Sequence, residues 1–272
     1  MIINKLVTQD NDLISTLKSW GFSPTLASYL YHHKYLIRVN DIQISHCNLK
    51  KGDLVSITLL EENKTYGNSS NSLDIKYEDD YLLIVNKPPN IATIPTIRHF
   101  DNNLSSDVTN YYIKNGVKSI IHIVNRLDYE TSGLIIFAKH AYIHSLFRNI
   151  KIEKYYLLKV HGIILKNGII NKPIMKDPLN KKKRIISEKG KESITEYEII
   201  RQDDNSTFLK AHLVTGRTHQ LRLHFSSINH PIIGDSLYGK DEGINLELVC
   251  NELKFIHPIT HSTIHIILNK NY

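Results

Sequence analysis

Short apolar runs, each bounded by turn-forming residues, predict several buried strands in this chain. β-branched and other apolar residues fill 82–85 and 134–138 and, apart from His122, also 120–124, and residues 154–162 alternate weakly and end in a glycine. Runs of four to eight apolar residues between turn signals are typical of strands that are covered on both faces. We therefore expect a strand in each of these four segments.

The amino-terminal residues follow a helical pattern instead. Asp10 or Asn11 can cap a helix that runs to Trp20, because their short side chains accept hydrogen bonds from the first free backbone amides. A Ser-Pro pair at 23–24 starts a second helix, which ends near His33. The pattern predicts a pair of short helices at this end of the chain.

Two strand-like runs follow the helices, at 35–39 and 54–59, and a Lys-Lys-Gly-Asp turn separates them. The chain then becomes polar and rich in Asn, Ser and Gly, as linkers are. We expect a small α/β unit at 1–61, a linker at 62–72 and a larger domain at 73–272.

The net charge of the chain indicates which kind of partner it binds, and its cysteine content indicates in which cellular compartment it works. The 272 residues include 34 Lys and Arg against 27 Asp and Glu, which gives a net charge of +7 and favours a polyanionic partner. The basic run at 181–184 is equally consistent with a solvated surface loop and with a segment that contacts phosphate groups. Two cysteines, Cys47 and Cys250, give no disulfide framework, so we expect a reducing cytoplasm. No run approaches the roughly 18 apolar residues of a spanning helix, so no membrane partner is expected.

The strongest chemical candidate is Asp128, which lies in a turn-rich stretch between two apolar runs. A carboxylate at the edge of a sheet must be paired or hydrogen-bonded, and Arg126, Thr131 and Ser132 are its neighbours in sequence. Asp128 is therefore either a structural group that these neighbours hold in place or the acid of an active site.

A second polar cluster follows the turn at 215–216. It contains Arg217, His219, Arg222 and His224, interleaved with apolar residues as in a strand or in an extended entry to a helix. Such a cluster can bind phosphate, a metal or a carboxylate. Two histidines with no nearby cysteine make a weak zinc site, whereas an arginine suits phosphate in any fold.

These segments together resemble the RluA-like pseudouridine synthases. Residues 126–133 match the family's central Arg-Leu-Asp-x-x-Thr-Ser-Gly motif, in which the Asp is catalytic, although Asn125 stands where most members carry His. Blocks at 77–89, 154–162 and 213–239 follow in the family's order. The resemblance therefore spans most of residues 73–272.

The resemblance implies an α/β (α+β) catalytic domain with a mixed, largely antiparallel sheet, and an isomerase that needs neither cofactor nor metal. Asp128 would be the nucleophile, Tyr156 would stack on the target uracil, and Arg222 would pair with Asp128. Asn86, Lys87 and Pro88 would form a scaffold, and 234–239 a packing turn. The residues expected to bind RNA are Arg126, Arg217, His219 and Lys154, with Arg126 filling the space that a flipped base leaves.

The amino-terminal unit resembles the small S4-like RNA-binding module that many of these enzymes carry. It lacks the arginine-rich face that usually meets RNA, and His32, His33 and Lys34 are a thin substitute. The module therefore either binds RNA weakly or only positions the rest of the chain.

Several readings of function stay open. We expect a monomer that acts on structured RNA, with ribosomal RNA as the first expectation and transfer RNA as the alternative. Asn125 also motivates a binding protein for ribosome assembly with little catalysis. A metal-dependent hydrolase that uses some of the 15 histidines is a third reading, and the scattered spacing of those histidines argues against it.

Overall fold

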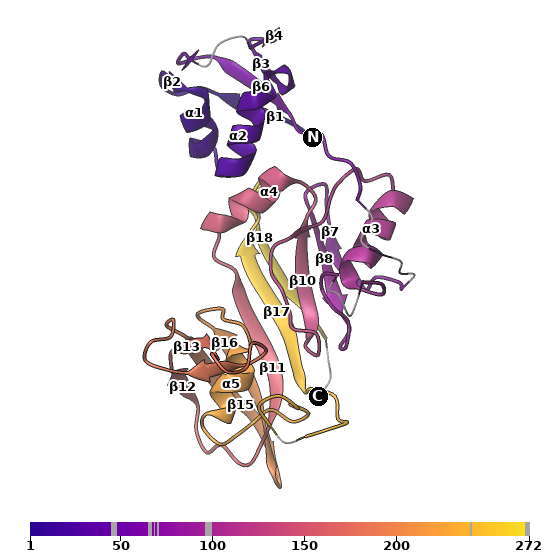
Figure 1. Cartoon of the computed structure of the whole chain (residues 1–272), viewed down its shortest axis with the longest axis vertical. Coiled ribbons are helices and arrows are strands. Elements are labelled where there is room, and N and C mark those ends of the chain that lie inside the picture. The colour runs from indigo at the N-terminus through magenta and orange to yellow at the C-terminus, as the bar shows by residue number, and fades with distance from the viewer. Residues whose placement is uncertain are drawn as a thin grey trace.

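The structure is a computed structural model that describes residues 1–44, 48–64, 67, 69, 71–95, 100–239 and 241–269. Cys47 and part of the expected linker, at 65, 66, 68 and 70, lie outside the described residues. The strands form separate sheets in the amino-terminal part and in the rest of the chain (Figure 1).

The amino-terminal part contains a four-stranded sheet in the order β1-β6-β3-β4, a short β2-β5 pair and two helices. Both expected helices and both expected strands are present, although a 3-10 turn at Lys34–Leu36 delays the first strand. The elements are β1 (Ile2–Leu6), β2 (Asn11–Asp12), α1 (Leu13–Ser19), α2 (Pro24–His32), β3 (Ile37–Val39), β4 (Ile42–Gln43), β5 (Asn48–Leu49) and β6 (Leu54–Thr58).

The cap of α1 differs from the expectation. Asp12 accepts the hydrogen bond from the Ser15 amide at 2.9 Å, because pairing of β2 with β5 keeps the chain extended to that residue. Asp10 instead accepts from the amide of Lys51 at 2.8 Å and fixes the turn before β6. The Ser23 cap of α2 is confirmed.

The rest of the chain is built on a ten-stranded sheet with the central order β12-β15-β16-β11-β17-β10-β8-β7. β10 and β17 run parallel, and their pairs with β8 and β11 are antiparallel, which confirms a mixed and largely antiparallel sheet. Its strands are β7 (Ile75–Glu78), β8 (Leu82–Lys87), β9 (His122–Ile123), β10 (Ser132–Ala138), β11 (Glu153–His161), β12 (Gly168–Asn171), β15 (Ile194–Asp203), β16 (Ser206–Leu213), β17 (Leu248–Ile256) and β18 (Thr263–Ile267).

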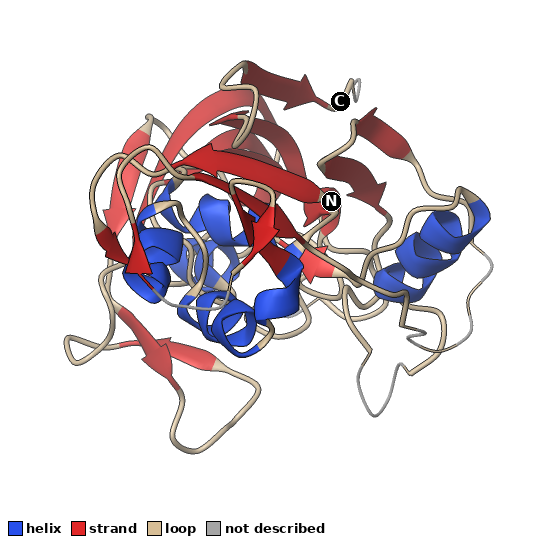
Figure 2. Cartoon of the chain, turned by 90° about the horizontal axis from the view of Figure 1, so that it is seen from above, coloured by secondary structure: helices blue, strands red, loops and turns tan. Residues whose placement is uncertain are grey.

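The remaining elements are three helices, a 3-10 turn at Phe147–Asn149 and a separate hairpin. From above, the helices of the amino-terminal part lie over the end of the long sheet, and α3 lies to one side (Figure 2). These elements are α3 (Leu104–Lys114), α4 (Ala141–Leu146), α5 (Gln220–Ser226), β13 (Ile174–Lys176) and β14 (Arg184–Ile186).

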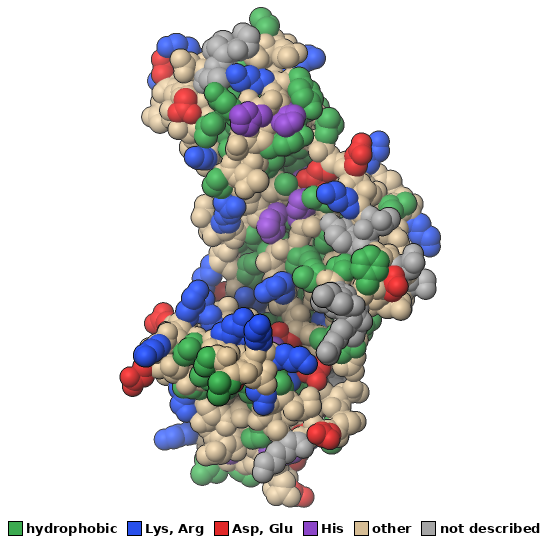
Figure 3. All heavy atoms as spheres, in the orientation of Figure 1, with side chains coloured by type: hydrophobic (Ala, Val, Ile, Leu, Met, Phe, Trp, Pro, Cys, Tyr) green, Lys and Arg blue, Asp and Glu red, His purple; other side chains and the backbone are tan. Residues whose placement is uncertain are grey.

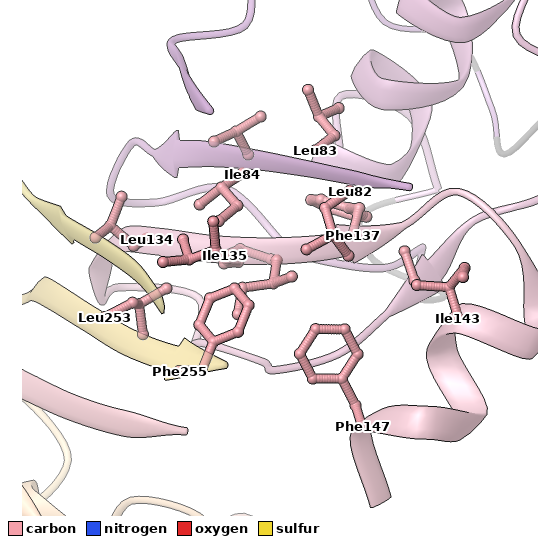
Figure 4. Close-up of a cluster of buried hydrophobic side chains, with 14 of the residues drawn as sticks. Leu82, Leu83, Ile84, Leu134, Ile135, Phe137, Ile143, Phe147, Leu253 and Phe255 are labelled. Atoms are coloured by element: carbon pink, nitrogen blue, oxygen red, sulfur yellow. The ribbon is translucent and has the colours of Figure 1, made fainter. Parts of the chain in front are cut away.

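The core of the larger part lies between β8, β10, β17 and α4 (Figure 4). All seven residues of β10 are buried, which is why its sequence is continuously apolar rather than alternating. The strand expected at 120–124 shortens to two residues. Beyond it Val124 donates a single backbone hydrogen bond to Ile136, and the chain then turns toward Asp128.

Candidate active site

A cavity of about 520 Å³ lies between the loop before β10, β11 and the start of α5. All seven residues to which the sequence assigned a role in catalysis or RNA binding line it, although they come from three distant segments. On the face drawn in Figure 3, lysine and arginine side chains gather around a hollow in the lower half of the molecule. The seven lining residues are Arg126, Asp128, Lys154, Tyr156, Arg217, His219 and Arg222.

Two side chains hold the loop that carries Asp128 in place, because they donate hydrogen bonds to its backbone carbonyls on both sides of Asp128. The Thr93 hydroxyl donates to the carbonyl of Leu127 at 3.2 Å, and the Lys87 ammonium donates to the carbonyl of Tyr129 at 3.0 Å. Lys87 is fully buried and also donates to two carbonyls of the loop after β8. Burial lowers the pKa of Lys87 to about 8, against the opposing charge of Asp128. The scaffold role expected for Lys87 agrees with these contacts.

Asn125 also has a structural position. Its side chain donates to the carbonyl of Leu134 at 3.1 Å and accepts from the amide of Ile136 at 2.8 Å. The amide group therefore pairs with the edge of β10 as a neighbouring strand would, and holds the start of the Asp128 loop against the sheet. An amide supplies the donor and acceptor that this contact needs at the same time.

Gly133 allows β10 to approach β17 closely. Its φ of +116° disfavours other residues, and an added Cβ would lie 2.3 Å from the carbonyl oxygen of Cys250. The close approach places β10 parallel to β17 directly after the Asp128 loop. The Gly of the central motif is thus required by backbone packing.

Tyr156 and Tyr155 lie on opposite faces of β11, as the alternation of a strand requires. Tyr156 is buried and lines the cavity, while Tyr155 stacks on His212 on the other face with 4.6 Å between ring centroids. Burial, the neighbouring Cys250 and the charge of Asp128 raise the pKa of Tyr156 well above its usual value. Its phenol therefore stays protonated and presents a neutral ring to the cavity. Lys154, on the same strand, has its pKa lowered by burial.

The structure corrects the expected partner of Arg222. Its guanidinium donates two hydrogen bonds to Asp235, at 2.7 and 2.9 Å, and lies 2.7 Å from a carboxylate oxygen of Glu130. Within the described ranges no ion pair joins it to Asp128. The buried Asp235 offers fork-to-fork geometry, which is the strongest arrangement for an arginine that α5 removes from water. Burial acts to lower the pKa of Arg222. The hydrogen bond and charge of Asp235, together with the charge of Glu130, outweigh burial and raise this pKa, and the charge of Asp128 also acts to raise it.

His219 is the side chain that comes nearest to Asp128 as an ion-pair partner. Its Nε2 lies 3.9 Å from Oδ1 of Asp128, and its Nδ1 shares a hydrogen bond of 3.0 Å with the hydroxyl of Tyr238. Burial lowers the pKa of His219 against the opposing charge of Asp128. The Asp128 side chain is 31% exposed, so one carboxylate faces the cavity with only a loose partner. Such a group is available to act as a nucleophile or a base.

Sequence analysis missed two of the residues that build this site. Glu130 occupies a variable position of the central motif, so nothing in the pattern marks it as a partner of Arg222. Asp235 belongs to the block at 234–239, which was interpreted as a packing turn. Its carboxylate does accept from the turn amides of Leu237 and Tyr238, but it also binds Arg222, so that interpretation was incomplete. An Asp directly after a Gly, at the start of the block at 234–239, was the available signal.

The described residues also bear on metal binding and on membrane insertion. Among them, no three His, Cys, Asp or Glu side chains converge in the way that a metal site needs. In the same part of the chain, no helix is both long and apolar enough to cross a membrane.

Comparison with known proteins places this site in a family. Residues 81–227 match the sequence profile described as RNA pseudouridylate synthase. YhcT of Bacillus subtilis, an uncharacterized RNA pseudouridine synthase, is 34% identical over 93% of this chain and 87% of its own length. The ribosomal large subunit pseudouridine synthase C of Buchnera aphidicola is 35% identical over 85% of this chain and 80% of its own.

A third relative and a solved structure agree. The dual-specificity RNA pseudouridine synthase RluA of Vibrio cholerae is 34% identical over 70% of this chain and 79% of its own length. The solved structure of human RNA pseudouridylate synthase domain containing 1 shares the fold, with a TM-score of 0.63 and 23% identity over 75% of this chain and 85% of that one. The chain therefore belongs to the RNA pseudouridine synthases, and is an isomerase that acts on RNA.

Proposed function

We propose that this enzyme converts specific uridines of structured ribosomal RNA to pseudouridine, with Asp128 as the nucleophile. The observation that carries the proposal is the Asp128 carboxylate, which is partly exposed to a cavity and has no close cationic partner among the described residues. Four of the relatives are named as ribosomal large subunit pseudouridine synthases, one of type C and three of type D, which supports ribosomal RNA as the substrate.

Binding would begin with the phosphate backbone and end with a flipped base. The reacting atoms of a stacked uridine are out of reach, so the nucleotide must leave the helix and enter the cavity. Arg126 is exposed at its rim, where it can occupy the space that the base vacates. Arg217, His219 and Lys154 line the same cavity and offer hydrogen-bond donors to the phosphates of the strand that enters it.

Tyr156 holds the base during the reaction. Stacking of a base on an aromatic ring contributes roughly 1 to 3 kcal/mol and does not depend on the identity of the base. Tyr156 is fixed by β11 and is largely buried, so it loses little side-chain freedom when a base binds. The cavity of about 520 Å³ is within the usual range of small-ligand sites.

The isomerisation exchanges one bond to the sugar for another. The carboxylate of Asp128 forms a covalent bond to the nucleotide, and the glycosidic bond from N1 to C1′ breaks. The base turns, C5 bonds to C1′, the bond to Asp128 breaks and frees the carboxylate, the proton on C5 leaves and N1 takes up a proton. No electrons are gained or lost, so the chemistry itself calls for no redox cofactor. Arg222, held by Asp235, supplies a fixed positive charge in the cavity wall.

Pseudouridine mapping tests this proposal. Carbodiimide adducts and reverse-transcriptase stops are compared in total RNA from cells with and without the gene. A ribosomal RNA site that disappears in the deletion should return with the wild-type gene and not with Asp128→Asn. A lost site in transfer RNA would change the substrate, and restoration by Asp128→Asn would refute the nucleophile. If no site is lost, the assembly-factor reading gains support.

A further inference from the structure

The amino-terminal part contacts the rest of the chain at the short helix α4 and, through Glu61, at the neighbouring segment 119–122. The hydroxyl of Tyr142 donates to the carbonyl of Trp20 at 3.0 Å, and the hydroxyl of Ser145 donates to the carbonyl of Gly21 at 2.8 Å. The rings of Phe22 and Tyr142 lie 4.3 Å apart, and both side chains are buried. The end of α1 therefore packs on α4 with both polar and apolar contacts.

Gly21 brings the two parts into direct contact. An added Cβ at this position would lie 2.5 Å from Cδ2 of Leu146, so the backbone of the module touches the last residue of α4. Gly21 also has a φ of +90°, which other residues rarely adopt. The conformation favours glycine here, and an added Cβ would have to displace the Leu146 side chain.

Glu61 closes the contact from the other end of the module. It follows β6 by three residues, and its side chain is only 10% exposed. Its carboxylate accepts from the amide of Ala141 at 2.7 Å and bonds to Nε2 of His122 at 2.9 Å. Because His140 provides no side-chain cap to α4, Glu61 satisfies the free amide at the start of that helix. Glu61, at the end of the module, is thus also fixed to α4.

The geometry points to α4 as a rigid joint: we propose that it fixes the amino-terminal module against the catalytic domain, so that both hold one structured RNA and the joint selects which RNA is modified. This inference rests on the proposed function. Parts of a chain with a small polar interface normally move relative to one another. Here a buried carboxylate, two hydrogen bonds and a glycine contact oppose that motion.

A rigid joint has a physical advantage for a long RNA. When two surfaces are linked in a fixed geometry, binding of the first brings the second to a high effective concentration, without new contacts. On the face drawn in Figure 3, histidine and basic side chains of the module and the basic side chains around the lower hollow point the same way. A single extended RNA can therefore meet both surfaces.

Gly21→Ala tests the joint, and Gly52→Ala is its matched control. Gly52 lies in the same module with a φ of +93°, but an added Cβ there meets nothing within 4 Å. Both variants carry the same backbone strain, and only Gly21→Ala pushes against α4. A second pair is Glu61→Gln with Glu62→Gln, since Glu62 is the exposed neighbour of Glu61. This second pair decides the question if Gly21→Ala does not fold.

Each variant is assayed on the full RNA that carries the mapped uridine and on a short stem-loop cut from it. We expect KM for the full RNA to rise about tenfold in Gly21→Ala, with kcat unchanged, because the module no longer adds to binding. Turnover of the stem-loop should stay at the wild-type value, and small-angle scattering should show a larger radius of gyration than Gly52→Ala gives.

Two results would overturn the joint: equal behaviour of the joint variant and its control on the full RNA, or an equal loss on both RNAs. The second would mean that the catalytic domain itself is damaged. A wild-type enzyme that forms pseudouridine in neither RNA would instead overturn the proposed substrate, while scattering would still decide whether α4 holds the two parts together.

Discussion

The cavity and the α4 joint each place a carboxylate beside a histidine, yet the two carboxylates are held in opposite ways. At the joint, Glu61 lies 2.9 Å from Nε2 of His122 and also accepts a backbone amide at 2.7 Å. In the cavity, Asp128 lies 3.9 Å from Nε2 of His219. Their exposed fractions are 10% and 31%. The number and closeness of the partners, rather than the residue types, therefore separate a structural carboxylate from an available one.

Asp235 extends the comparison into the cavity itself. It is fully buried and satisfied by Arg222 and two backbone amides, although it lies in the same site as Asp128. Burial acts to raise the pKa of Asp235, but the hydrogen bond and charge of Arg222 and the two turn amides outweigh this effect, so the pKa lies below its ordinary value. The fully paired Asp235 holds Arg222, which lines the cavity, and the loosely paired Asp128 lines the cavity itself.

The largest effect separates the two carboxylates by turnover. We expect Asp128→Asn to reduce the rate of pseudouridine formation by roughly 10⁴-fold or more, because it removes the nucleophile. The affinity for RNA should change by no more than a few-fold, since little contact area is lost. Glu61→Gln should keep its turnover on a short stem-loop. Single-turnover rates and filter binding measure both. Equal losses in the two variants would break the comparison.

The second effect compares the two partners of Arg222 by stability. Asp235→Ala leaves a buried guanidinium without its main partner and should lower the free energy of unfolding by about 3 to 5 kcal/mol. Glu130→Ala removes a partner whose side chain is 30% exposed, and should lower it by about 1 kcal/mol or less. Urea unfolding of both variants gives the values. If Glu130→Ala is the more damaging, the assignment of Asp235 as the main partner is wrong.

The third effect appears on acidification. Burial acts to raise the pKa of Glu61, but the His122 imidazole and the Ala141 amide outweigh it, and the pKa lies below its ordinary value of 4.5. A lowered carboxyl pKa stabilises the fold above the unfolded-state pKa, and this stabilisation is lost as pH falls through the folded-state pKa. Below about pH 4.5 the wild type should therefore lose more stability than Glu61→Gln. Parallel curves of unfolding free energy against pH would contradict this.

The smallest effect compares single hydroxyl groups. Thr131, in the cavity wall, has a buried hydroxyl with no hydrogen-bond partner in the described structure, so Thr131→Val should change stability by less than about 0.5 kcal/mol. Tyr142→Phe removes the bond to Trp20 at the joint and should cost about 1 kcal/mol. Thermal unfolding of both proteins is sufficient. A larger loss for Thr131→Val would mean that its hydroxyl is paired.

Local sequence patterns determined much of this protein. The apolar runs at 82–85 and 134–138 became β8 and β10, since burial on both faces of a central strand leaves a continuous apolar signature. The weakly alternating segment at 154–162 became β11, in which buried and partly exposed residues alternate from Tyr156 onward. The Ser-Pro start of α2 was also evident, because capping depends on neighbours within three residues. The resemblance to a family then brought the candidate residues of three segments into one expected site, and all of them line one cavity.

Only the tertiary structure decided how those residues are paired. Gln220, Arg222 and His224 alternate with apolar residues, yet they lie buried in the helix α5, because each finds a partner from a distant segment. The partner of Arg222 is Asp235 rather than Asp128, and Glu61 reaches α4 from beyond the last strand of the module. A sequence states which groups must be satisfied when they are buried. The choice of partner depends on distances across the fold, which local patterns do not contain.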